Sequence, residues 1–134
     1  MCLRGASEVE HVLLAAQPDP RLRAYVVWVP KLGGAEQDVP AATTLVSDAR
    51  ARHYWDASAV LVRSYDSVLG LHEDAWDVYM IYGADARWTG VTPPAPAFWM
   101  HQLGSADHPR VRGPYLEPRV FAAQANSLLR LAPK

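Results

Sequence analysis

Residues 24–30 read Ala-Tyr-Val-Val-Trp-Val-Pro, and this run decides the fold. Its apolar residues follow one another without the alternation typical of a strand that faces water on one side. β-branched and aromatic residues favour strands, and Pro30 ends the run because proline has no backbone N–H to donate. The run therefore predicts an interior parallel strand with helices over both faces and with Val26, Val27 and Val29 in the core.

Helices and strands alternate on either side of this run. Apolar residues recur at helical spacing from Leu3 to Ala16, which predicts an amphipathic helix that Pro18 and Pro20 end. The elements expected after the run are a short helix that begins near Asp38 and Pro40 and ends near Val46, a strand at 52–55, a helix at 56–70, strands at 78–82 and 98–103, and a helix from Pro118. This order predicts an α/β fold whose closing hairpin makes the sheet mixed.

The composition narrows the class of protein. The chain has 134 residues and no long linker, so we expect a single domain over residues 1–134. A net charge of -1 leaves no electrostatic footprint for nucleic acid. No apolar run approaches the ~20 residues that span a bilayer, and no signal-peptide pattern opens the chain. One cysteine, Cys2, rules out an internal disulfide, so a reducing, cytoplasmic location is expected. The charge and the short apolar runs together predict no membrane partner.

Three groups of residues follow the order of a known superfamily. The first is Cys2-Leu3-Arg4-Gly5, which opens the first helix ahead of the strand at 24–30. The second is His53-Tyr54-Trp55-Asp56 followed by Tyr65 and Leu69-Gly70-Leu71, and the third is the strand at 78–83 followed by Asp85. Their order and spacing, which cover most of the chain, resemble the thioredoxin-like fold in the redoxin form that includes thiol–disulfide oxidoreductases and peroxiredoxin-like proteins.

The resemblance implies a three-layer mixed sheet with helices on both faces and a catalytic role for Cys2. Two parts of the family pattern are missing: neither a strand nor a second cysteine precedes Cys2, and residues 73–77 contain no proline where the family has a cis-proline. We therefore expect a sheet that lacks its first central strand and a functional domain that begins before Met1, with Cys2 as the second cysteine of a Cys-x-x-Cys. The alternatives are flanking strands that close the gap and a strand borrowed from another copy.

The chemistry open to Cys2 follows from its position at the start of a predicted helix. The helix dipole and the positive charge of Arg4 favour a thiolate there. Such a thiolate is a monothiol nucleophile or a ligand for a soft metal ion. The alternative is an inert cysteine at a frayed terminus.

The other reactive side chains show no catalytic spacing. The histidines lack any metal-ligand motif, and His101, within a predicted strand, is expected to be a hydrogen-bonded structural residue. Glu73, Asp74 and Asp77 are expected to be solvated acids of a turn. Trp76, Trp88 and Trp99 lie around the predicted hairpin and are candidates for an exposed groove that binds a partner.

Three functions remain open at this stage. The first is a thioredoxin-like protein of redox lineage that performs thiol–disulfide chemistry through Cys2 and an upstream cysteine, with a protein or a small thiol as partner. The second is a non-catalytic thioredoxin-like module that binds a partner through its aromatic hairpin. The third is soft-metal binding through Cys2. No cofactor is expected for any of them, and a fold alone does not choose among them.

Overall fold

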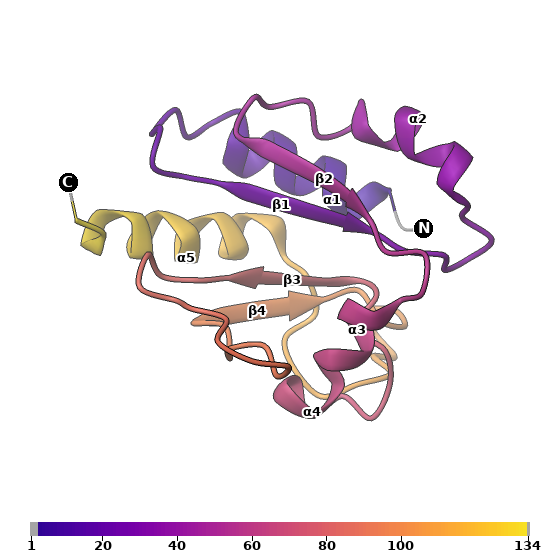
Figure 1. Cartoon of the computed structure of the whole chain (residues 1–134). Helices are drawn as coiled ribbons and strands as arrows, with labels where there is room; N and C mark the ends of the chain where they lie inside the picture. Colours follow the sequence, from indigo (N-terminus) through magenta and orange to yellow (C-terminus); the bar gives the residue numbers. More distant parts are fainter. Residues whose placement is uncertain (1–2, 134) are drawn as a thin grey trace. The chain divides into compact units, whose positions relative to one another are not determined.

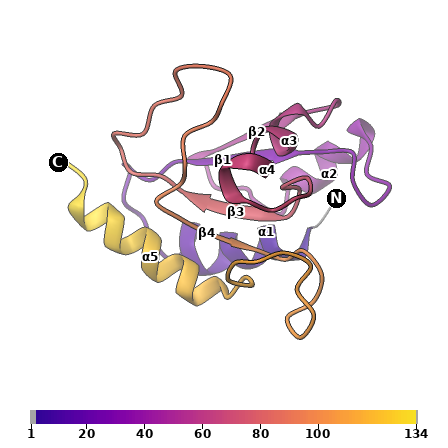
Figure 2. The ribbon, with the colours of Figure 1, turned by 90° about the horizontal axis from the view of Figure 1, so that it is seen from below.

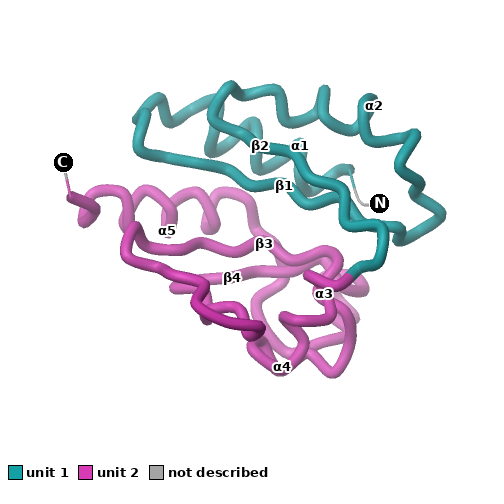
Figure 3. The backbone as a smooth tube through the Cα atoms, viewed as in Figure 1, with its two compact units in different colours: residues 1–59 teal, residues 60–134 magenta. Residues whose placement is uncertain are grey.

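A computed structural model describes residues 3–133 of the chain, which divides into two compact units, Met1–Ala59 and Val60–Lys134 (Figure 3). Both units combine helices with strands, and each holds one two-stranded sheet. The expected mixed α/β class is therefore confirmed. The three-layer sheet and the single domain of the sequence analysis stay predictions.

The first unit is built around a parallel pair of strands (Figure 1). Its elements are α1 (Arg4–Val9), the π-helical turn η1 (Glu10–Leu14), β1 (Ala24–Trp28), the 3-10 turn η2 (Glu36–Asp38), α2 (Val39–Thr43) and β2 (Ala51–Trp55). β1 and β2 run parallel in a register that pairs Val26 with His53. These elements confirm the N-terminal helix, the run at 24–30, the short helix near Pro40 and the strand at 52–55.

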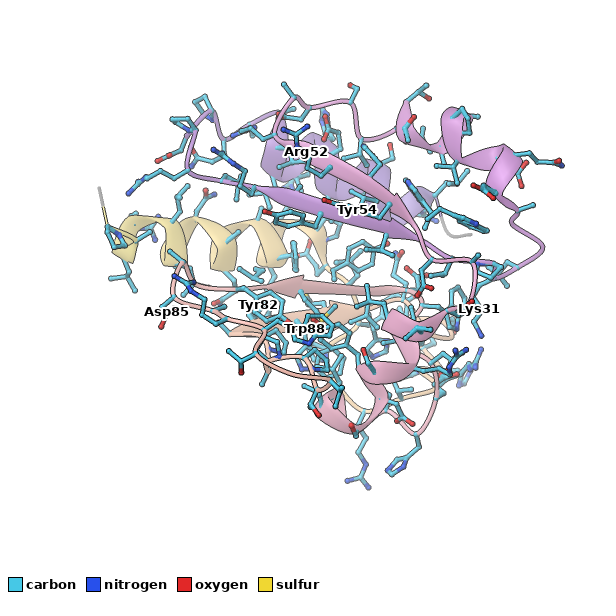
Figure 4. All side chains as sticks on the ribbon, viewed as in Figure 1. Lys31, Arg52, Tyr54, Tyr82, Asp85 and Trp88 are labelled. Carbon is cyan, nitrogen blue, oxygen red and sulfur yellow. The ribbon has the colours of Figure 1, made fainter. Side chains whose placement is uncertain are left out.

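The prediction of an interior strand with Val26, Val27 and Val29 in the core is correct only in part: among the described strands β1 pairs with β2 alone, and only Val29 of the three valines is buried. Trp28 and Val29 are buried, whereas Val26 and Val27 are half-buried and Tyr25 is 69% exposed. β2 also exposes Arg52, which pairs with Tyr25, and Tyr54, which pairs with Val27; Figure 4 labels both. One face of this strand pair is therefore rich in exposed side chains. Exposed and half-buried residues alternate along β2, as expected for a strand with one face in solvent, although the β1 sequence shows no such alternation.

The second unit is built around an antiparallel hairpin. Its elements are α3 (Val60–Ser64), α4 (Asp66–Leu69), β3 (Val78–Ile81), β4 (Phe98–His101) and α5 (Pro118–Leu131). β3 pairs with β4 in a register that places Val78 opposite His101, which confirms the predicted hairpin. α5 lies beside this hairpin in both ribbon views (Figures 1 and 2). Tyr79 of β3 and Phe121 of α5 meet edge to face with ring centroids 6.2 Å apart.

The single helix predicted at 56–70 is wrong, because two short helices occupy the segment. Ala59 has a φ of 52°, and its N–H bonds to the carbonyl of Asp56 in a turn, so helical structure starts only at Val60. Gly70 ends α4 in the left-handed conformation that the sequence predicts. The left-handed Ala59 carries no sequence signal, since alanine rarely adopts that conformation.

Two long loops leave opposite ends of the β3–β4 hairpin (Figure 2). One joins the two strands over residues 82–97, and the other connects β4 to α5 over residues 102–117. The second loop contributes Leu103 and Val111 to a hydrophobic cluster with Tyr65, Leu71 and Ala75. No helix within residues 3–133 has both the length and the hydrophobicity needed to cross a membrane.

Candidate functional site

A groove of about 480 Å³ lies in the first unit beside the start of α1. It is lined by Leu3, Leu32, Gly33, Gly34, Asp38, Ala41, Ala42 and Leu45. Cys2, the predicted catalytic residue, lies outside the described residues, but its sequence neighbour Leu3 is part of the lining. The residue that follows the predicted nucleophile in the sequence is thus part of a groove.

The loop after β1 forms one wall of this groove. Leu32 and Gly33 both have positive φ, 52° and 76°, and the N–H of Gly34 bonds to the carbonyl of Lys31 over 3.0 Å. This turn presents Leu32 and bare backbone to the groove. Lys31, labelled in Figure 4, begins this turn and is separated from the end of β1 by Val29 and Pro30.

The opposite wall comes from η2 and α2. Asp38 Oδ2 accepts the N–H of Ala35 over 2.9 Å, which closes the first turn, and Pro40 lies in the first turn of α2. The Asp38 carboxylate is therefore engaged at the start of the helix. The other residues of the lining are leucines, glycines and alanines, with small or apolar side chains. Such a groove suits an apolar side chain or a stretch of polypeptide rather than a highly charged ligand.

Arg50 fastens the far end of the helix that follows Cys2. Its guanidinium donates to the backbone carbonyls of Leu14 (2.6 Å), Gln17 and Asp19 (3.0 Å). It also donates to both carboxylate oxygens of Asp48, over 2.8 and 2.6 Å. These carbonyls belong to the last turn of η1 and the loop after it, where helix carbonyls lack partners. The Arg50 hydrogen bonds lower the pKa of Asp48 to about 2.

A carboxyl group that the sequence analysis missed lies in the same helix. Glu10, the first residue of the π-helical turn, has a buried Oε2 without a hydrogen-bond partner. Burial, and after it the negative charge of Asp48, raises the pKa of Glu10. Arg50 contacts this helix through Leu14, the last residue of η1, and its other two carbonyl partners, Gln17 and Asp19, lie in the loop that follows.

Comparison with known proteins gave no match. No family model, no curated protein and no solved structure is similar to this chain. Function must therefore be argued from the residues of the two units themselves.

His101 is the hydrogen-bonded structural residue that the sequence predicts. Its ring is fully buried, its Nδ1 accepts the N–H of Leu103 over 3.1 Å, and its Nε2 lies 3.3 Å from the carbonyl oxygen of Gly113. Burial lowers the pKa of His101, which outweighs the opposite effects of the Gly113 hydrogen bond and of the charges on Asp77 and Glu73. With both ring nitrogens engaged and no access to solvent, His101 is not placed to act on a substrate.

The prediction of solvated turn acids is wrong for Asp77. This residue is 5% exposed, its Oδ1 accepts the Tyr79 hydroxyl over 2.9 Å, and its carbonyl accepts the N–H of Gln102. The burial follows from its position directly before β3, where the hairpin and the loop after β4 meet. A sequence with three acids in five residues gives no sign that one of them faces inward.

Part of the aromatic surface around the hairpin is used in contacts within the second unit. The hydroxyls of Tyr65 and Tyr82 lie 2.7 Å apart, the Tyr82 hydroxyl also donates to the carbonyl of Pro94 over 3.0 Å, and Trp88 meets Tyr65 edge to face at 6.1 Å. Figure 4 shows Tyr82 and Trp88 close together in the second unit. Trp88 remains 47% exposed and Val91 94% exposed, so the surface left for a partner is the tip of the 82–97 loop.

A metal site finds no support within residues 3–133, where no three His, Cys, Asp or Glu side chains gather in a way that could hold an ion. The structure thus brings together the neighbour of Cys2 and an apolar groove in one unit. The hairpin aromatics and His101 belong to the other unit and form its packing.

Proposed function

We propose that this chain is a thioredoxin-like protein of redox lineage that uses Cys2 as a thiol nucleophile, with the groove next to Leu3 as the binding surface for its disulfide substrate. The observation that carries the proposal is that the residue after Cys2 lines an apolar groove of about 480 Å³. The order of helices and strands and the position of Cys2 just ahead of α1 support the same assignment.

The proposed step is thiol–disulfide exchange. The Cys2 thiolate attacks one sulfur of a substrate disulfide, a mixed disulfide forms, and the other substrate sulfur leaves as a thiolate. A second thiol then attacks the Cys2 sulfur and completes the exchange: two thiols are oxidised as one disulfide is reduced. Because the chain has a single cysteine, that second thiol comes from a small thiol or from a cysteine outside these 134 residues.

The first prediction concerns the reactivity of Cys2. We expect its thiol pKa to lie below the ordinary value of ~8.5, because the start of a helix stabilises a thiolate. Since Cys2 is the one cysteine of the chain, the rate of alkylation by iodoacetamide as a function of pH reports this pKa directly. A midpoint at or above the ordinary value would identify Cys2 as an unactivated terminal thiol and contradict the proposal.

The groove is tested separately by filling it. Ala41→Trp places a large side chain in the groove lining, and Ala57→Trp makes the same change at an exposed site of the first unit that is not part of that lining. We expect Ala41→Trp to slow the reaction of Cys2 with an aromatic disulfide by about tenfold, equivalent to ~1.4 kcal/mol of lost binding. Alkylation by the small iodoacetamide should be unchanged in both variants. Equal rates for the two variants with the aromatic disulfide would remove the groove from the proposal.

A second candidate, a binding module, is favoured by the exposed tip of the 82–97 loop, where Trp88 and Val91 present apolar surface. A photo-crosslinking residue at Val91 is expected to capture a partner in cells. The same residue at Leu131, which is 82% exposed in α5, serves as the matched control. A specific adduct at 91 but not at 131, preserved after Cys2 has been alkylated, would favour this candidate over thiol chemistry; equal labelling at both sites would count against it.

A further inference from the structure

His101 connects both ends of a loop to the end of β4. Its Nδ1 accepts the N–H of Leu103 over 3.1 Å, and its Nε2 lies 3.3 Å from the carbonyl oxygen of Gly113. Its backbone adds two bonds, from its own N–H to the carbonyl of Pro114 and from the N–H of Leu116 to its carbonyl. One fully buried residue therefore closes residues 103–113 into a loop.

The hydrogen bonds define the protonation state of the ring. Nδ1 accepts a backbone N–H, so it carries no proton, and the single proton of the neutral ring sits on Nε2 and is donated to Gly113. A second proton on Nδ1 would place an N–H against the N–H of Leu103. Two buried donors facing each other lose their hydrogen bond and gain none, so the charged ring does not fit the closed loop.

The surroundings of the ring act on its pKa in both directions. Trp99 lies 6.0 Å away in a tilted arrangement, and Tyr115 meets the ring edge to face at 5.7 Å. The charged groups that face it are Asp77 and Glu73, which precede β3 and favour protonation; Glu73 is itself paired with Arg110 of the loop. Burial outweighs both acids and holds the pKa of His101 below 6.5 in the closed loop.

We propose that His101 is a pH-sensitive latch: protonation of its ring releases residues 103–113 from the β3–β4 hairpin and exposes Leu103 and Val111. The direction follows from linkage. The released loop leaves the ring in water, where it takes up a proton at its ordinary pKa, whereas the closed loop holds the ring neutral. The closed loop is therefore fully favoured above that pKa and loses stability as the pH falls through it.

Hydrogen exchange of single amides tests the latch. Between the ordinary pKa of ~6.5 and the lower pKa of the closed loop, the protection factors of the Leu103, Arg110 and Leu116 amides should fall by up to about tenfold per pH unit, because opening takes up one proton. Protection factors are used since they already correct for the pH dependence of intrinsic exchange. Amides of α5, such as that of Phe121, should show no such slope, which separates local release from unfolding of the whole unit.

Two variants and one direct measurement complete the test. His101→Asn offers a non-titrating acceptor near the position of Nδ1, and its loop protection should not vary with pH. His108→Gln removes an exposed histidine of the same loop and should retain the slope of the parent protein. If His101→Asn fails to fold, nitrogen NMR shifts of the parent imidazole decide: a proton on Nδ1, or a pKa at or above 6.5, overturns the latch. A slope shared by all amides, or a slope that survives in a folded His101→Asn, overturns it as well.

Discussion

Arg50→Ala is expected to destabilise the first unit by about 2–4 kcal/mol, because it removes the guanidinium that donates to the Asp48 carboxylate and to several buried or half-buried carbonyl groups. The guanidinium bonds Asp48 at 2.6 and 2.8 Å and the carbonyl of Leu14 at 2.6 Å, and only 15% of the side chain is exposed. The measurement is the free energy of unfolding in urea, followed by far-UV circular dichroism. Arg50→Lys should recover only part of the loss, since an ammonium group does not fork across a carboxylate.

The matched control for this change is Arg52→Ala. Arg52 lies two residues further along on the exposed face of β2, and its loss should change stability by less than about 0.5 kcal/mol, as for most surface substitutions. A similar small effect for Arg50→Ala would show that the fan of hydrogen bonds around Asp48 and Leu14 contributes nothing net. It would also remove the anchor that we assign to the helix following Cys2.

Local patterns predicted the elements that are decided locally. The run at 24–30 predicts β1, Pro118 predicts the start of α5, and Gly70 predicts the end of α4. Each of these features depends on the conformational propensities of adjacent residues. The antiparallel pairing of β3 with β4 was also predictable, since consecutive strands usually pair. The α/β class follows from these elements together.

Features that depend on distant residues were not predictable. Arg50 reaches carbonyls more than thirty positions earlier in the chain, and the carbonyl of the buried Asp77 accepts the N–H of Gln102, in the loop that follows β4. Nothing in the neighbouring sequence distinguishes Arg50 from the exposed Arg52, or Asp77 from the half-buried Asp74. The groove beside Leu3 belongs to the same category, because its lining comes from Leu3, the loop after β1, and the segment of η2 and α2. Cys2 stands out in the sequence because it is the one cysteine and precedes a predicted helix, and its role as a site residue stays a prediction.

Gly104→Ala is expected to cost about 2–4 kcal/mol, because two separate penalties fall on one position. Gly104 has a φ of 91°, which side chains rarely tolerate, and an added Cβ would come within 2.5 Å of the carbonyl oxygen of His108 and 2.8 Å of the N of Arg110. Neither backbone atom can move freely, since the His108 carbonyl accepts the N–H of Ser105 and the Arg110 N–H bonds to the carbonyl of Leu103.

Gly90→Ala provides the control for this last prediction. An added Cβ there meets nothing within 4 Å, and the backbone does not have positive φ, so the change should be neutral or slightly stabilising through the unfolded state. Urea unfolding of the two variants side by side measures the difference. If Gly104→Ala lies within about 0.5 kcal/mol of Gly90→Ala, the 103–113 loop is not closed as tightly as the hydrogen bonds around His108 and Arg110 require. The latch at His101 would then have no ordered loop to release, so this single comparison bears on the fold of the second unit and on its proposed response to pH.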